Sequence, residues 1–129
     1  MINKYGKQGK YFRYSAAAAD IATLTAWTVP ITDVQASQYG PFVRCVIRNI
    51  SNKQIKIGFD TGVVDAVGVT VQNENKTVLI PAGLTVDLGA SKIDPFTRMF
   101  VYNMDTESID TNTGATEIIE VVIYNYGGA

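Results

Sequence analysis

Apolar side chains recur at every second position in most segments of this 129-residue chain. A period of two places successive side chains on opposite faces of an extended strand, so each such run predicts a half-buried β-strand. β-branched residues are frequent in these runs, which also favours strands. The apolar members of the clearest runs are Val43, Cys45 and Ile47; Ile55, Ile57 and Phe59; Val67, Val69 and Val71; Leu84, Val86 and Leu88; Phe100 and Tyr102; and Ile119, Val121 and Ile123.

Turn-forming residues separate these runs. Residues 49–53 make an Asn/Ser-rich connection of hairpin length, and Ile80-Pro81-Ala82-Gly83 fits a type I turn with proline second and glycine fourth. Residues 105–114 form the longest polar stretch and are predicted to be an exposed loop. Further strands are expected at 21–29 and, as a short edge strand, at 11–14.

Together these elements predict an all-β fold, a single β-sandwich or jelly roll of seven to eight short antiparallel strands. Only Ser15–Asp20 has a helical pattern, with Ser15 as a cap before four alanines. We expect residues 1–14 to form an extended basic and aromatic N-terminal arm, and residues 15–129 to form the sandwich domain.

The composition excludes most familiar catalysis, because the chain has no histidine and one cysteine. Without histidine, the Ser-His-Asp and Cys-His nucleophile systems and the usual zinc and haem ligand sets cannot be built. No Walker-type loop or GxGxxG motif follows a strand. The carboxylates lie in polar loops, without the apolar surroundings that raise a catalytic pKa. We therefore expect no enzymatic activity, no catalytic residue and no cofactor.

Two further groups of residues are interpreted as structural. Cys45 lies on the same strand face as Val43 and Ile47, which is typical of a small core residue. As the lone cysteine of the chain, it cannot form an internal disulfide. Residues 105–112 offer several oxygen ligands for Ca²⁺, but their spacing does not match an EF-hand loop. Asp60 and Asp65 fit turn positions equally well. No metal site is predicted.

Charge is distributed unevenly, although the net charge is only −1. Residues 1–13 contain four basic side chains and no acid, whereas five acids and no base follow Arg98. The two ends can attract each other within one chain or between neighbouring copies; the alternative is a solvated tail and a solvated acidic loop.

The last predicted strand breaks the alternation. Ile118, Val122 and Tyr124 are apolar on the face opposite Ile119, Val121 and Ile123, and residues 99–102 share this two-faced character. A strand of an isolated sandwich keeps one face wet, so the second apolar face predicts cover from the arm, a loop or another subunit. We therefore expect a homo-oligomer or a place in a larger assembly.

Nucleic acid, a membrane and a glycan are considered as other classes of partner. Tyrosines interleave the basic arm as stacking platforms for nucleic acid would, but four charges in a near-neutral chain disfavour that reading. No uncharged run is long enough to span a membrane. Glycan binding stays an alternative through Tyr39, Tyr124 and Tyr126, whereas Trp27 lies in an apolar strand and is assigned to the core.

Residues 46–60 resemble a recurrent segment of small virion proteins from tailed bacteriophages. There, a strand ending in Arg-Asn leads through a Ser/Asn turn to a strand ending near Gly-Phe-Asp, as in Arg48-Asn49 and Gly58-Phe59-Asp60 here. Leu79-Ile80-Pro81-Ala82-Gly83, followed by strand 84–88, continues the resemblance. It implies a structural role in a phage particle, as a head decoration or auxiliary capsid protein, with a neck, tail or head-fibre position as the alternative.

The resemblance and the residues together predict a virion protein, made in the host cytoplasm. It would dock on the major capsid protein or on another copy of itself through the arm and the two-faced strands. The predicted partner-binding residues are Lys4, Tyr5, Lys7, Lys10, Tyr11, Phe12, Arg13, Tyr14, Ile118, Val122 and Tyr124.

Overall fold

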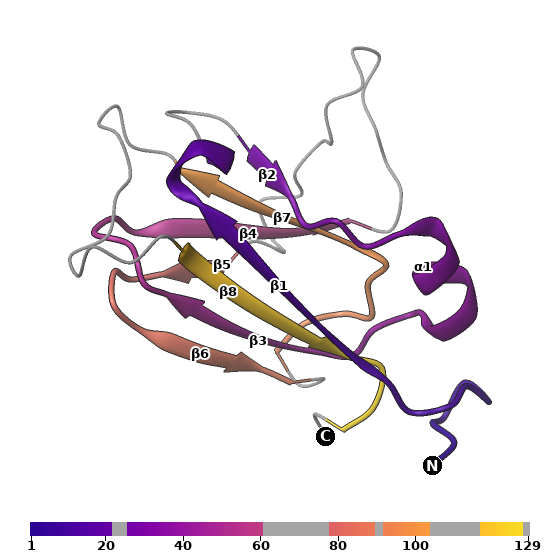
Figure 1. Ribbon diagram of the computed structural model, residues 1–129. Helices are drawn as coiled ribbons and strands as arrows, with labels where there is room; N and C mark the ends of the chain where they lie inside the picture. Colours follow the sequence, from indigo (N-terminus) through magenta and orange to yellow (C-terminus); the bar gives the residue numbers. More distant parts are fainter. Residues whose placement is uncertain (22–25, 61–77, 90–91, 104–116, 128–129) are drawn as a thin grey trace.

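A computed structural model describes residues 1–21, 26–60, 78–89, 92–103 and 117–127 (Figure 1). The elements in chain order are β1 (Tyr11–Ala17), the 3-10 helix η1 (Ala18–Asp20), β2 (Ala26–Thr28), α1 (Asp33–Tyr39), β3 (Arg44–Asn49), β4 (Ile55–Asp60), β5 (Val78–Ile80), β6 (Thr85–Leu88), β7 (Arg98–Asn103) and β8 (Glu117–Tyr124).

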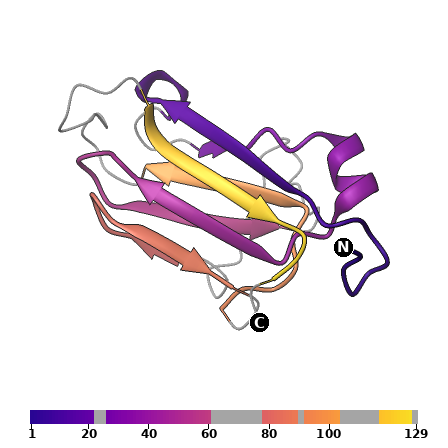
Figure 2. The same ribbon diagram turned by 60° about the horizontal axis from the view of Figure 1, so that its bottom comes forward.

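The strands of the described residues form two four-stranded antiparallel sheets, in the orders β1-β8-β3-β6 and β2-β7-β4-β5 (Figures 1 and 2). Their pairing is nested: β1 pairs with β8, β2 with β7, β3 with β6 and β4 with β5, as in a long hairpin that has been rolled up. Contacts between β3 and β8 and between β4 and β7 complete the sheets. This arrangement is a jelly roll, so the predicted all-β fold is confirmed.

The core lies between the two sheets and contains many of the residues that the alternation predicted to face inward, but Leu84, from the run with Val86 and Leu88, is 50% exposed. Cys45, Ile47 and Ile57 are fully buried there. Phe42 and Phe96 are also fully buried, and an isolated bridge joins their backbones. The strand predicted around residues 67–71 and the loop predicted at 105–114 lie outside the described residues.

The helix predicted over Ser15–Asp20 is wrong for its first half, because residues 15–17 continue β1. Pairing with β8 satisfies their backbone groups, which an isolated helix of a turn and a half does poorly in water. Only residues 18–20 form a 3-10 turn, and the Asp20 carboxylate accepts a hydrogen bond from the Ala17 N–H over 2.8 Å.

α1 was not predicted from the sequence, although its start has a recognisable signal. The Thr32 hydroxyl accepts a hydrogen bond from the Gln35 N–H, and the Gln35 side-chain oxygen accepts one from the Thr32 N–H, both over 3.1 Å. This reciprocal pair is a capping box, which a Thr followed three residues later by Gln announces.

The structure places residues 11–14 within the sandwich rather than in a separate arm. They belong to β1, which forms one edge of its sheet (Figure 2). The boundary expected after residue 14 therefore does not divide an arm from the domain. The segment that precedes β1 is residues 1–10.

Candidate partner-binding surface

Residues 1–10 form a small turn-back structure, which we call the N-terminal hairpin. An isolated antiparallel bridge joins Ile2 and Gln8, and the Asn3 N–H donates to the Lys7 carbonyl over 2.7 Å. Gly6 lies in the turn with φ of +75°, a conformation that costs glycine little and other residues more. The segment expected to extend therefore folds on itself.

Asn125 ties this hairpin to the sandwich. Its side chain is 1% exposed; its Oδ1 accepts from the Lys10 N–H over 2.7 Å, and its Nδ2 donates to the carbonyls of Gln8 (2.8 Å) and Tyr39 (3.0 Å). The Asn3 side-chain amide donates in turn to the Asn125 carbonyl over 2.6 Å. One buried amide thus holds the N-terminal hairpin against β8 and the end of α1.

The hairpin lysines make neutral contacts. The Lys7 Nζ donates to the Ser37 carbonyl over 3.0 Å, and the Lys10 Nζ lies 5.7 Å from the centre of the Tyr39 ring. The Lys4 Nζ lies 5.3 Å from the centre of the Tyr5 ring. In the part of the chain that the structure describes, none of the three lysines forms an ion pair. None of these three contacts neutralises a lysine charge.

Three tyrosines gather on the outer face of the β1-β8-β3-β6 sheet. The Tyr124 ring centre lies 5.9 Å from that of Tyr11 and 5.7 Å from that of Tyr126, whose plane is at 89° to it. The Arg44 guanidinium lies 4.7 Å from the centre of the Tyr124 ring, close enough for a cation–π contact. Tyr11 is 62% exposed. We call these four residues the aromatic patch.

Val122 lies beside the aromatic patch on the same outer face. It is half-buried, opposite Arg13 on β1 and opposite Val46 on β3. Long basic side chains cover apolar neighbours with their methylene stems, so part of the second apolar face of β8 is covered by its own sheet.

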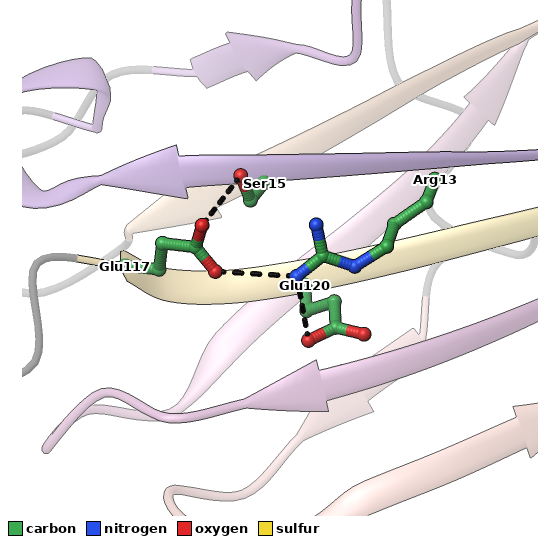
Figure 3. Close-up of polar contacts among 4 residues, drawn as sticks. All are labelled: Arg13, Ser15, Glu117 and Glu120. Carbon is green, nitrogen blue, oxygen red and sulfur yellow. Dashed lines mark hydrogen bonds and ion pairs between the residues drawn. The ribbon is translucent and has the colours of Figure 1, made fainter.

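Arg13 forms an ion-pair cluster with β8 (Figure 3). Its Nη2 lies 3.1 Å from a Glu120 carboxylate oxygen and 3.3 Å from a Glu117 carboxylate oxygen. The Ser15 hydroxyl donates to the other Glu117 oxygen over 3.3 Å. The hydrogen bond from Arg13, with its positive charge, lowers the pKa of Glu120. Arg13, from the basic N-terminal end, thus pairs with two acids of the acidic C-terminal end of the same chain.

A second ion pair lies on the same outer face, between β3 and β6. Arg44 on β3 donates to both Asp87 oxygens on β6, over 3.0 Å and 2.7 Å. These hydrogen bonds lower the pKa of Asp87. The charges around the aromatic patch are therefore largely paired.

Two predicted partner-binding residues of β1 point into the sandwich instead. The Phe12 ring centre lies 5.7 Å from that of Tyr39 and 6.0 Å from that of Phe42. The Tyr14 hydroxyl donates to the Gln35 side-chain oxygen over 2.8 Å, and partial burial raises the pKa of Tyr14. Both side chains pack against the core of their own chain.

Ile118 was also predicted to bind a partner, but it is fully buried. The register explains this: Ala16 pairs with Ile119 and Ala17 pairs with Glu117, so Ile118 is an extra residue without a partner on β1. Such a β-bulge breaks the two-residue period locally and re-aims a side chain. Ile118 therefore fills the core of its own chain.

Several residues of this surface are not among the predicted partner-binding residues. Arg44 joins the patch through the pairing of β3 with β8, which only the strand register reveals. Tyr126, which the sequence suggested only for glycan binding, joins it through its ring contact with Tyr124. Met1 and Ile2 are 74% and 68% exposed at the start of the N-terminal hairpin. A Cβ added to Gly9 would lie within 3.4 Å of both the Met1 side chain and the Tyr126 ring, so the hairpin and the aromatic patch meet there.

The described residues offer little for other chemistry. They contain no group of three Asp, Glu or Cys side chains that could hold a metal ion, and no helix long and apolar enough to cross a membrane. The calcium ligands considered at 105–112, and Asp65, lie outside them. Cys45 is buried, and Trp27 packs against the core as expected. Tyr39 is half-buried beside Lys10.

Comparisons of the chain with protein-family models, with curated proteins and with solved structures gave no match.

Proposed function

We propose that this chain is a non-enzymatic structural protein of a bacteriophage virion. It docks on the major capsid protein or on a neighbouring subunit through the N-terminal hairpin and the aromatic patch. Jelly rolls serve in viral capsids and also in lectins and cupins, so the fold is compatible with this role without identifying it.

The observation that carries the proposal is the continuity of the surface. Exposed Met1 meets Tyr126 at Gly9, and Tyr126 leads through Tyr124 to exposed Tyr11. Contiguous apolar and aromatic surface on a small protein marks an interaction site. Tyrosine and arginine are also the residue types that dominate the energetic centres of protein interfaces.

The charges on this surface indicate which groups the partner presents to it. Arg13 and Arg44 are satisfied by acids of their own sheet, so the aromatic patch presents a nearly neutral face. The hairpin lysines have no such acids among the described residues and favour an acidic rim on the partner. Exposed ion pairs contribute about 1 kcal/mol or less each, so burial of the tyrosines supplies most of the affinity.

The test uses the phage whose genome encodes this chain, with the amount of the protein on purified particles as the measurement. We expect the double variant Tyr11→Ser/Tyr124→Ser to lower particle occupancy about tenfold or more, as loss of two aromatic contacts implies. The matched control is Leu79→Ser/Leu84→Ser, because both leucines are at least half exposed but lie on or beside β5 and β6. Circular dichroism checks that both variants fold. Wild-type protein absent from particles would refute the proposal.

Glycan binding is the second candidate, and one observation favours it. The Tyr11 ring is 62% exposed, with the Arg44–Asp87 pair on the same face. Sugars stack on such rings and bond to nearby polar groups. Saturable binding on a glycan array that Tyr11→Ala removes, together with absence from particles, would assign the aromatic patch to carbohydrate instead.

A further inference from the structure

The edge formed by β1 differs from the other sheet edges. Counted over the described residues, the edge strands β2 and β5 have three residues each and β6 has four, whereas β1 has seven. β1 contains no proline and only one charged residue, Arg13. Natural edges are usually shortened, charged or interrupted, because an open edge is a template for pairing with another strand.

The free backbone groups of β1 can be assigned. The Asn125 N–H donates to the Lys10 carbonyl over 3.1 Å, so Lys10 directs its backbone groups toward β8. Because this direction alternates along an antiparallel strand, Tyr11, Arg13 and Ser15 direct their N–H and C=O groups away from β8. Among the described residues, no strand pairs with that side of β1.

We propose that a second copy of this chain pairs there, β1 against β1 and antiparallel, with Arg13 opposite Ser15 of the second copy. The two-fold axis then passes between the two Tyr14 residues. This inference goes beyond the proposed function, because it concerns the purified protein and needs no virion.

Charge and length select this register. Centring the axis on Arg13 would place two arginines directly opposite each other, which is unfavourable. Centring it on Phe12 would pair only residues 11–13 of each strand. Centring it on Tyr14 gives the longest overlap, residues 11–17, in which the Ala17 N–H keeps its hydrogen bond to the Asp20 carboxylate. It also brings each Arg13 to the Ser15 of the other copy, whose hydroxyl already contacts a Glu117 carboxylate. Bulky Phe12 then lies opposite small Ala16.

The pairing has a consequence for docking. Residues directly opposite in a sheet point to the same face, so the two-fold axis is perpendicular to the joined eight-stranded sheet. Both aromatic patches then lie on one face of the dimer. Two linked sites bind a repetitive surface more tightly than one, without any new contact.

The first experiment measures molar mass by light scattering at high micromolar concentration. We expect a dimer for the wild-type chain and a monomer for Ser15→Pro, which removes an outward N–H that β8 does not use. Thr85→Pro is the matched control: the Asn49 N–H donates to the Leu84 carbonyl over 2.9 Å, so Thr85 directs its N–H away from β3 at the opposite edge. We expect it to stay dimeric. A monomeric wild-type chain, or a dimeric Ser15→Pro variant with unchanged circular dichroism, would overturn the proposal.

The second experiment tests the register by oxidation of single-cysteine additions. In the proposed register, Tyr14→Cys places two thiols in a non-hydrogen-bonded pair, at a spacing that a disulfide spans. We expect Tyr14→Cys to cross-link and Arg13→Cys not to. Cross-linking of Arg13→Cys alone would refute the register. These readouts are independent of particle occupancy, so dimerisation and docking can fail separately.

Discussion

The side-chain amide of Asn49, at the end of β3, donates to the carbonyl of Ile80, at the end of β5, over 3.1 Å. This bond connects the two sheets of the sandwich. The same amide reaches the Lys53 carbonyl at 2.8 Å, and its oxygen accepts from the Ser51 N–H at 3.1 Å. Asn49 is fully buried, so no water can replace these partners.

We therefore predict that Asn49→Ala lowers the free energy of unfolding by about 3 kcal/mol, since it leaves several buried groups without a partner. Urea denaturation at neutral pH measures the change. Gln54→Ala, an exposed position before β4, is the control and should stay within about 0.5 kcal/mol of wild type. Equal stability of the two variants would show that Asn49 does not hold the sheets together.

Asn125 gives a prediction about the N-terminal hairpin. Asn125→Ala removes the acceptor of the Lys10 N–H and the donor to Gln8. We expect faster hydrogen exchange at residues 3–10 and a loss of about 2 kcal/mol in stability, as for a buried amide that leaves partners unsatisfied. Exchange mass spectrometry resolves the hairpin from the sandwich.

Lys7→Ala is the control for this change, because it removes only one exposed bond to the Ser37 carbonyl. Its exchange pattern should match wild type. Unchanged protection of residues 3–10 in Asn125→Ala would mean that other contacts hold the hairpin in place.

The sequence predicted the fold well because burial of a half-apolar strand depends on local alternation. The inward positions of Cys45, Ile47 and Ile57 follow from that pattern alone. The capping box that starts α1 is equally local, and a reading that tested for Thr32 and Gln35 would have found the helix.

The surface was harder to predict because it depends on pairing between distant strands. β1 and β8 are separated by nearly the whole chain, and only their register shows that Ile118 is the extra residue of a bulge. The contact of Arg44 with Tyr124 likewise requires β3 to lie beside β8. Short-range patterns carry no information on either relationship.

The Arg13–Glu120 pair predicts a pH dependence. The hydrogen bond from Arg13 is the main cause that lowers the Glu120 pKa, and Arg48 adds to it. A carboxyl group with a lowered folded-state pKa stabilises the fold above its unfolded pKa of about 4.3, and this contribution is lost as pH falls through the folded value. Wild type should therefore exceed Glu120→Gln in stability at pH 7, with the difference shrinking at low pH.

Thermal unfolding of both proteins from pH 7 to pH 2 measures this difference. Asp87 is present in both, so its own lowered pKa cancels from the comparison. Added salt should also reduce the difference, because this pair is partly exposed. A gap between the proteins that is constant across the pH range would mean that packing, and not charge, accounts for the effect of the substitution.

Cys45 is predicted to be unreactive in the folded protein. Its side chain is fully buried with its Sγ 3.6 Å from the Met99 Sδ, and burial raises the pKa of the thiol. Alkylation requires the thiolate form and access of the reagent to the sulfur, and burial of Cys45 disfavours the thiolate and blocks that access. We expect iodoacetamide to modify Cys45 only as fast as the chain unfolds, so the rate should rise in destabilised Asn49→Ala. Ser15→Cys is the positive control, because residue 15 is half-exposed at the β1 edge. It should react fast at a concentration low enough to keep the protein monomeric. Rapid labelling of native wild type, with circular dichroism unchanged, would show that this end of β3 opens without global unfolding.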